Sequence, residues 1–172
     1  MRIKDLLNAK AIDLDGRAAS KTEAIDRLID LMKGTGNIAN SAEYRKAVFA
    51  REEAGSTGIG EGVAIPHAKT KAVLKPGLSA MVVKNGVDFD SLDGAPAKLL
   101  FLIAAPDTEE NVHLDVLGRL SVLLMDEAFR EKLIGAKNSA EFIRIVDEAE
   151  AVKFNETAVQ TDEKSGGYEI LA

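Results

Sequence analysis

Apolar residues recur at helical spacing in the first third of the chain. Ser20, followed three residues later by Glu23, forms a capping-box pattern at the start of such a run. Apolar positions then repeat over residues 24–32, and Gly34 follows them as a stop signal. The same spacing predicts a second helix over residues 41–53. Two consecutive helices are therefore expected before the first long apolar segments.

Shorter apolar segments between turn signals predict strands. An extended piece is expected around residues 12–14, and a strand over Leu78–Val83. Asn85-Gly86 predicts a tight turn before another extended piece at residues 87–89. The unbroken apolar run Lys98–Ala104 predicts a central strand that is buried on both faces.

Helical spacing returns after this central strand. Helices are predicted over Glu109–Met125, around Phe129–Leu133 and from Asn138 or Ser139 onward. Because helices precede, separate and follow the strands, the fold class is predicted as α/β, with helices covering a central sheet in layers.

Composition narrows the classes of function. The chain has 172 residues, of which 46% are hydrophobic and 29% charged, as expected for one globular domain with a tail. The absence of cysteine excludes disulfides, thiolate catalysis and cysteine metal sites, and is compatible with a reducing cytoplasm. A net charge of −6 without any Lys/Arg run argues against nucleic-acid binding. No segment reaches the roughly 18 apolar residues of a membrane span, and no signal peptide is recognisable.

The candidate chemistry centres on His67, one of only two histidines. A glycine-dense passage, Gly55–Gly62, runs into the apolar segment Val63–Pro66, and His67 follows directly. Proline forbids a helix here, so His67 is expected at the end of a strand, where α/β folds place reactive groups. Glycines allow close backbone approach, and their N–H groups can form an anion nest.

The second histidine and one arginine complete the candidate site. His113 is expected in the first turns of the Glu109–Met125 helix, whose positive end favours an anion and keeps an imidazole neutral. Arg51 is a candidate hydrogen-bond donor to phosphate, because its planar guanidinium suits phosphate oxygens. A nucleophilic imidazole with such donors favours phosphoryl transfer through a phosphohistidine. No Walker A spacing follows the glycines, so a nucleotide is not the expected donor.

Other interpretations of these residues stay open at this point. The glycine passage is equally compatible with a flexible loop, and Arg51 with an ion pair on its own helix. His113 is equally compatible with a helix cap or a solvent-facing side chain. Metal binding by His67 and His113 lacks obvious carboxylate partners, and no nucleophile-elbow pattern supports Ser56 or Thr57 as a nucleophile.

The segment Glu52–Ala68 closely resembles the active-site signature of the fructose/mannitol-type enzyme IIA (EIIA) domains of the bacterial sugar phosphotransferase system. That signature has an acidic or amide residue, then a hydrophobic-Gly pair, then Ala-Ile-Pro-His and a small residue, and all are present here. The resemblance continues through Ser91–Gly94, Phe101–Pro106 and His113-Leu114, and it covers about residues 1–150.

The resemblance implies a role for each candidate residue. His67 matches the histidine that is phosphorylated through Nε2, His113 the second active-site histidine, and Arg51 the arginine beside the phosphate. The small phosphocarrier protein HPr would donate the phosphoryl group, and a IIB domain would accept it, with no cofactor and no metal. The family fold is a three-layer sandwich, a mixed central sheet with helices on both sides.

The polar end of the chain suggests a domain boundary. We expect an EIIA domain over residues 1–152, a polar linker over 153–167, and the truncated start of a IIB domain at 168–172. The resemblance makes a fused IIA–IIB–IIC permease the expected parent. The EIIA domain would then be cytoplasmic, tethered through IIC but without membrane contact of its own.

Three classes of function share this signature. The first is a phosphotransferase that serves the uptake of fructose or a related sugar. The second is a nitrogen-regulatory-type IIA protein that signals through its phosphorylation state, and such proteins usually stand alone. The third is an IIA-like regulatory domain of a transcription factor, for which no DNA-binding module is visible in the sequence.

Overall fold

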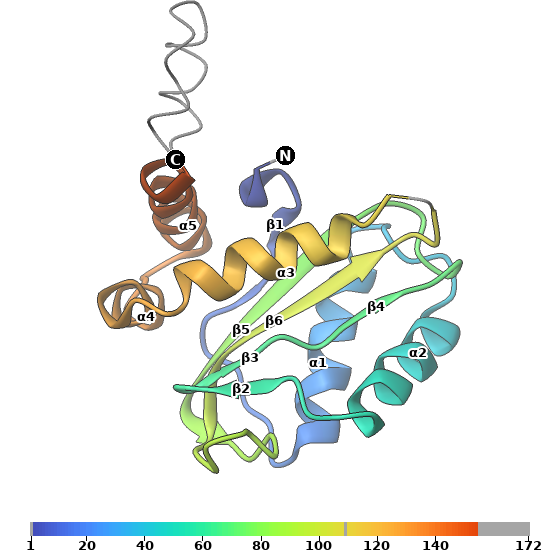
Figure 1. The fold of residues 1–172 in the computed structure, drawn as a ribbon, viewed down its shortest axis with the longest axis horizontal. Coiled ribbons are helices and arrows are strands. Elements are labelled where there is room, and N and C mark those ends of the chain that lie inside the picture. Colours follow the sequence, from blue (N-terminus) through green and yellow to red (C-terminus); the bar gives the residue numbers. More distant parts are fainter. Residues whose placement is uncertain (1, 109, 155–172) are drawn as a thin grey trace, which may run out of the picture.

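The computed structural model describes residues 2–108 and 110–154, which fold into one sheet with helices on both faces (Figure 1). Most of the predicted helices and strands are present. In chain order the elements are η1 (Ile3–Asp5), β1 (Leu7–Asp13), α1 (Lys21–Lys33), α2 (Ser41–Glu53), β2 (Gly58–Gly60), β3 (Val63–Ala64), β4 (His67–Lys69), β5 (Gly77–Val87), β6 (Ala97–Ala105), α3 (Val112–Leu123), α4 (Glu127–Ile134) and α5 (Ser139–Phe154).

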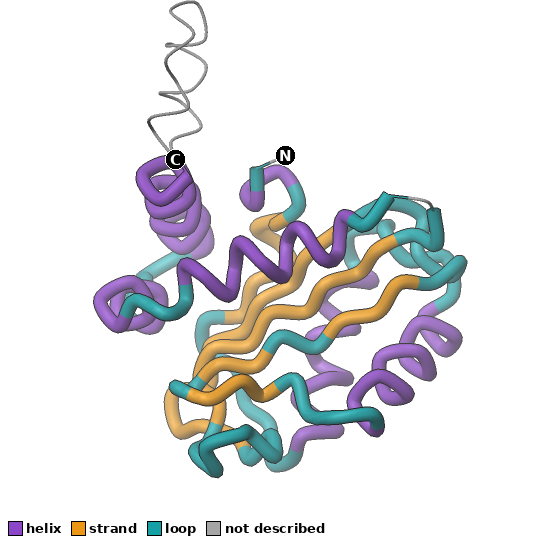
Figure 2. The backbone as a smooth tube through the Cα atoms, viewed as in Figure 1, coloured by secondary structure: helices purple, strands orange, loops and turns teal. Residues whose placement is uncertain are grey.

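The sheet has the strand order β1-β5-β6-β3-β2, and β4 also pairs with β6 (Figure 2). β5 and β6 are antiparallel, and so are β2 and β3, whereas β1–β5, β3–β6 and β4–β6 are parallel pairs. The sheet is therefore mixed, as predicted. β3 and β4 lie end to end along β6, separated by Ile65 and Pro66.

The central strand β6 contributes to two separate cores. Leu99, Phe101 and Ile103 pack with α3, α4 and α5 on one face. Leu100 and Leu102 pack with α1 and α2 on the other face. Side chains alternate across a strand, so an all-apolar strand can support both layers. In Figure 1, α3 crosses in front of the sheet and α1 lies behind it. The three-layer α/β sandwich is confirmed.

The start of α1 follows the predicted capping pattern. The hydroxyl of Ser20 accepts a hydrogen bond from the amide of Glu23 at 3.2 Å. This bond satisfies one of the amides that a helix N-terminus leaves without an internal partner. Ala24, Ile25 and Leu28 are fully buried behind it, which confirms the inward face of the helix.

The predicted tight turn at Asn85-Gly86 is wrong. These residues belong to β5, which continues to Val87 and pairs there with Ala97 of β6. The register shifts between Val82 and Val87, so the pairing with β6 is irregular there, like an extended bulge, within one continuous strand. Gly86 permits the bulge because its φ is 78°, and a Cβ there would lie 2.8 Å from Pro96.

Two other element boundaries also differ from the predicted ones. α3 covers Val112–Leu123, which is shorter at both ends than the predicted helix over 109–125. α5 continues through Lys153 to Phe154, so it includes the first two residues of the predicted linker. The rest of that linker and the predicted strand start at 168–172 lie outside the described residues. None of the helices among residues 2–108 and 110–154 is long and apolar enough to span a membrane.

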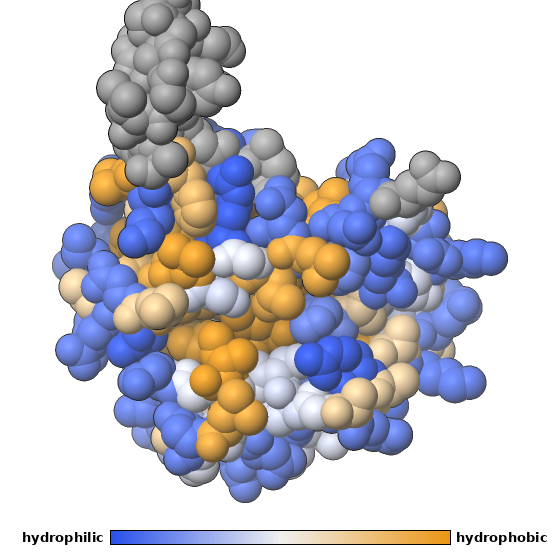
Figure 3. Space-filling model, viewed as in Figure 1, coloured by the Kyte–Doolittle hydropathy of each residue, from blue (hydrophilic) through white to orange (hydrophobic). Residues whose placement is uncertain are grey.

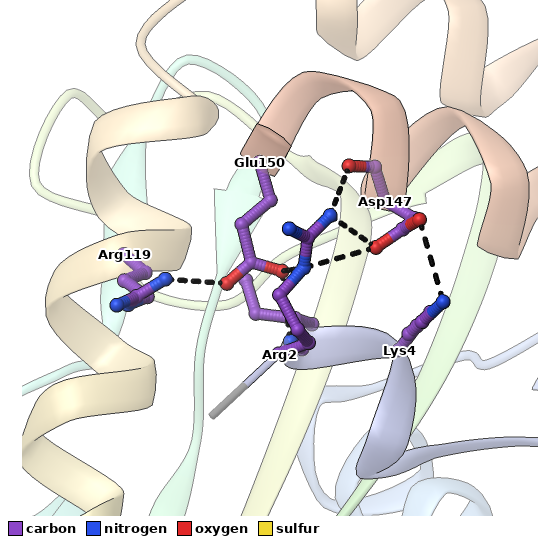
Figure 4. A network of polar contacts seen from close by, with 6 residues as sticks. Arg2, Lys4, Arg119, Asp147 and Glu150 are labelled. Carbon is purple, nitrogen blue, oxygen red and sulfur yellow. Dashed lines mark hydrogen bonds and ion pairs between the residues drawn. The ribbon is translucent and has the colours of Figure 1, made fainter. Parts of the chain in front are cut away.

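A polar cluster joins the N-terminus to α5 and α3 (Figure 4). Glu150 of α5 is fully buried and accepts hydrogen bonds from the Ile3 amide at 2.8 Å and from Arg119 of α3 at 2.8 Å. Arg2 lies 3.5 Å from the same carboxylate and donates to Asp147. We call these residues, with Lys4 beside Asp147, the Glu150 clasp.

Candidate active site

His67 lies where the edge of the sheet is interrupted. β3 ends at Ala64, and β4 begins at His67, which is in register with Ile103 of β6. Pro66 has no amide hydrogen, so it cannot continue the ladder as a donor. The sequence placed His67 at a strand end, and the structure places it at the first residue of a new short strand. Its side chain is 9% exposed.

The His67 ring is held in one tautomer. Its Nδ1 lies 2.9 Å from the carbonyl oxygen of Ile65. A carbonyl oxygen can only accept, so Nδ1 must carry the hydrogen in the neutral ring. Nε2 then keeps its lone pair. This is the arrangement that a nucleophilic imidazole requires.

His113 lies beside His67. It is the second residue of α3, in the first helical turn as predicted, and the two ring centroids are 6.4 Å apart. The pKa of His113 is lowered, first by burial of the ring and then by the charges of His67 and Lys69. Its Nδ1 is buried without a hydrogen-bond partner among the described residues. His113 therefore contributes a neutral ring with an unused nitrogen.

Lys69 adds positive charge to this region. It is the last residue of β4, and its ammonium group donates to the side-chain oxygen of Asn111 at 3.3 Å. Asn111 precedes the first turn of α3, so the lysine and the positive end of the helix are close together. Such an environment favours an anion next to the two histidines. The sequence alone did not single out Lys69, because its nearness to Asn111 depends on the tertiary structure.

Arg51 forms its hydrogen bond with its own loop. It lies in the last turn of α2, is exposed, and donates to the carbonyl of Gly55 at 2.7 Å. Among the described residues, no hydrogen bond joins it to His67 or His113. The structure thus shows a ring contact between His67 and His113, and a bond from Arg51 to the loop that follows its own helix.

The glycine passage forms a hairpin instead of an open anion nest. β2 and β3 are joined by Glu61 and Gly62, both with positive φ, as a two-residue hairpin turn requires. The amide of Gly58 donates to the Ser56 hydroxyl, and that of Glu61 to Asp93. A Cβ on Gly58 would lie 2.6 Å from the Ser91 hydroxyl oxygen. These glycines therefore allow close packing, and the nest interpretation is wrong for these amides.

The hydroxyls of Ser56 and Thr57 are engaged in structural bonds. Ser56 donates to the carbonyl of Phe89 at 2.7 Å, and Thr57 donates to the carboxylate of Glu52. Glu52 also accepts from the Thr57 amide at 3.1 Å and pairs with Lys21 at 2.8 Å. The sequence contained Glu52 as the acidic residue of the signature but gave no reason for its burial. Its position on the inner face of α2 was the signal that could have indicated a buried, paired carboxylate.

A buried tyrosine supports the strand opposite His67. The hydroxyl of Tyr44, on α2, donates to the carbonyl of Ile103 at 2.8 Å. Burial raises the pKa of Tyr44 well above its ordinary value, so the phenol remains protonated and can donate. The backbone that is in register with His67 is therefore fixed from the α2 side of the sheet.

Known proteins match this chain over most of its length. The family model for the phosphoenolpyruvate-dependent sugar phosphotransferase system, EIIA 2, matches residues 5–149. The fructose-specific EIIABC component of Bacillus subtilis (strain 168) is 41% identical over 148 residues, 86% of this chain but only 23% of that protein. The fructose-specific EIIA component of Haloferax volcanii is 40% identical over 136 residues, 79% of this chain and 88% of that one.

Solved structures share the fold. Nitrogen regulatory protein IIA-Ntr from Neisseria meningitidis superposes with a TM-score of 0.78 at 30% identity, covering 84% of this chain and 98% of that one. The complex of mannitol enzyme IIA with phosphorylated mannitol enzyme IIB from Escherichia coli matches with a TM-score of 0.70 at 30% identity, covering 82% and 98%. The chain belongs to the EIIA type 2 family of the sugar phosphotransferase system, whose members are phosphotransferases that carry a phosphohistidine.

Proposed function

We propose that His67 accepts a phosphoryl group from phospho-HPr and passes it to a IIB domain for the uptake of fructose or a related sugar. The observation that carries this proposal is the hydrogen bond from Nδ1 of His67 to the Ile65 carbonyl, which leaves the Nε2 lone pair available. In the forward step Nε2 bonds to phosphorus, the P–N bond of the donor breaks, and its electron pair returns to the donor histidine.

The neighbouring groups would stabilise the charge on the phosphoryl oxygens. A neutral His113 has a ring N–H that can donate to such an oxygen, and Lys69 and the N-terminus of α3 supply positive potential. Arg51 is exposed, so its guanidinium can exchange the Gly55 carbonyl for a phosphoryl oxygen without loss of buried contacts. In this proposal His67, His113 and Arg51 act together only when the phosphoryl group is present.

The partner proteins would approach over an apolar surface near the site. Leu114 and Val122 of α3 and Ile59 of β2 are exposed. Figure 3 shows hydrophobic side chains gathered over α3 and β2 on this face. Leu114 directly follows His113, so the apolar surface begins at the site. Apolar exposed patches of this kind fit protein docking. The two fructose-specific relatives support fructose as the sugar, and the EIIABC component of Bacillus subtilis supports fusion of IIB to the same parent chain.

A nitrogen-regulatory role is the alternative. The structure of IIA-Ntr from Neisseria meningitidis is similar to this chain, and the same phosphohistidine chemistry would then report nutrient status through protein binding. Transfer of label from phosphorylated His67 onto a cysteine of a IIB domain discriminates between the two roles. A transport protein completes that transfer, and a regulator does not.

The central test is phosphorylation of the chain with phosphoenolpyruvate, enzyme I and HPr. Wild-type protein should acquire one phosphoryl group, mapped to His67 by mass spectrometry under mildly alkaline conditions, and the adduct should be lost in acid and survive base. His67→Ala should acquire none. Full-strength labelling of that variant, or an adduct that survives acid, would contradict the proposal and point to Ser56 or Thr57.

A further inference from the structure

We propose that Glu52 is a positioning residue for His67, acting through Thr57 and Ile65. This inference rests on the proposed function of His67 as the nucleophile. Glu52 does not touch the histidine. It fixes the backbone that holds the imidazole in its reactive tautomer.

The first link joins Glu52 to Thr57. Glu52 is 7% exposed and Thr57 is 3% exposed, so solvent does not compete for their bonds. One carboxylate oxygen accepts from the Thr57 amide at 3.1 Å, and the other accepts from the Thr57 hydroxyl. Two bonds from one carboxylate to one residue fix both the position and the orientation of Thr57.

The second link joins Thr57 to His67. The carbonyl of Thr57 accepts from the Ile65 amide at 3.0 Å, and the carbonyl of Ile65 accepts from Nδ1 of His67 at 2.9 Å. A continuous series of hydrogen bonds therefore runs from the carboxylate on α2 to the ring. Glu52 fixes Thr57, the Thr57 carbonyl then fixes Ile65, and the Ile65 carbonyl orients the His67 ring.

The backbone between β3 and β4 is held from two sides: the Pro66 carbonyl accepts from the Ile103 amide at 3.0 Å, and the Glu52–Thr57 series holds Ile65. Ile65 and Pro66 lie in the gap between β3 and β4, and β3 has only two residues. Proline donates no hydrogen bond, so the amide of Ile65 is the donor that this gap offers. That amide is bonded to Thr57, so the series holds the Ile65 end of the gap, where the carbonyl that accepts from His67 lies.

Lys21 offsets the free-energy cost of burying the Glu52 carboxylate. Its ammonium group lies 2.8 Å from the carboxylate and 4.9 Å from the centre of the Phe89 ring. A buried carboxylate without a partner would be strongly destabilising. A carboxylate is an acceptor only, which suits both the two Thr57 donors and the Lys21 ammonium group.

The decisive variant is Glu52→Met, which keeps the volume and removes both acceptors. We expect kcat for phosphorylation by phospho-HPr to fall on the order of 10- to 100-fold, with KM unchanged, because Glu52 is buried and meets no partner. Nitrogen-15 NMR of the histidine rings should show His67 gaining the Nε2–H tautomer. Glu52→Gln keeps one carbonyl acceptor and should restore much of the rate. Glu53→Met, at the exposed neighbouring position, is the matched control and should resemble wild type.

Thr57→Val and Thr57→Ser form a second, independent pair. If Glu52→Met does not fold, Thr57→Val should still lower kcat several-fold and shift the tautomer, while Thr57→Ser retains the wild-type values. A wild-type rate and tautomer in a folded Glu52→Met, or in Thr57→Val when the former does not fold, overturns the inference. So does a slower rate with an unchanged tautomer, because the role would then be structural.

The tautomer measurement separates this inference from the proposed function. It is made on the unphosphorylated chain and needs no donor protein. Failure of wild-type protein to accept a phosphoryl group would refute the function and leave the tautomer result standing. A labelled wild type with an unaffected Glu52→Met would refute the positioning role alone.

Discussion

Glu52 and Glu150 are two buried carboxylates on opposite faces of the sheet, the first on α2 and the second on α5. Both are neutralised by cations, Glu52 by Lys21 at 2.8 Å and Glu150 by Arg119 at 2.8 Å. Their other partners differ. Glu52 binds a residue five positions further along the chain, whereas Glu150 binds the amide of Ile3, 147 positions away.

The difference in sequence separation gives the two carboxylates different tasks. The bonds of Glu52 shape one loop, and that loop leads directly to His67. The bonds of Glu150 hold the N-terminal segment, α5 and α3 together, so breaking them loosens three elements and leaves the buried Ile3 amide without its partner (Figure 4). We therefore expect disruption of the Glu150 clasp to appear in stability, and disruption of Glu52 to appear in the rate of phosphoryl transfer.

The largest effect is expected for Glu150→Ala. Removal of one partner from a buried ion pair leaves uncompensated charge, so the free energy of unfolding should fall by about 3–5 kcal/mol. Urea denaturation measures this loss. Glu148→Ala, at an exposed position on the same helix, is the control and should remain within about 0.5 kcal/mol of wild type.

The rate of the folded Glu150→Ala protein sharpens the comparison. Below its unfolding transition, His67 in this variant should accept phosphate as fast as in wild type. A slower reaction of fully folded protein would show that the clasp reaches the active site through Arg119 and α3. The division between stabilising and positioning carboxylates would then be incorrect.

A smaller effect is expected from pH. The folded-state pKa of His113 is lowered, chiefly by burial, below its ordinary value of 6.5, so protonation favours the unfolded chain. The free energy of unfolding should decline as pH falls below about 6.5 and stop declining below the folded pKa. His113→Gln should lack this component.

NMR titration of the two histidine rings checks the cause directly. In wild type the pKa of His113 should lie below 6.5, and His67→Gln should raise it without restoring the ordinary value, because burial is the larger cause. A wild-type His113 that titrates at or above 6.5 would contradict the neutral ring assumed at the active site.

The smallest effect is expected for an ion pair that lies in solvent. Arg45 on α2 pairs with Asp26 on α1 at 2.6 Å, and their side chains are 47% and 40% exposed. Arg45→Met should change the free energy of unfolding by no more than about 1 kcal/mol and leave phosphorylation unaffected. A larger loss of unfolding free energy would mean that burial does not explain why the Glu52 and Glu150 pairs contribute more than this exposed one.

The sequence predicted most of the fold because its signals are local. Helix α1 begins at the predicted cap of Ser20, and the apolar run of β6 became the central strand. The error at Asn85-Gly86 shows the limit of such signals. Asn-Gly fits both a hairpin turn and a bulge, and only pairing with β6 decides between them.

The candidate site also combines features set by local sequence with features set by long-range packing. His67 and His113 could be chosen because the chain has only two histidines, each next to a recognisable structural boundary. Their ring separation of 6.4 Å could not be predicted, because it depends on how α3 packs against the β4 edge. Arg51 was predicted beside the phosphate, and its bond to the Gly55 carbonyl could not be predicted, because it depends on how the loop after α2 folds back.

The sequence by itself determined the layered α/β fold and the family and made His67 the candidate reactive residue, because periodicity and the Ala-Ile-Pro-His motif are properties of neighbouring residues. Only the tertiary structure shows the hydrogen bond that sets the tautomer of His67, the burial that lowers the pKa of His113, and the different partners of the buried carboxylates Glu52 and Glu150. Those features depend on burial and on hydrogen bonds between distant segments, and such contacts exist only once the chain has folded.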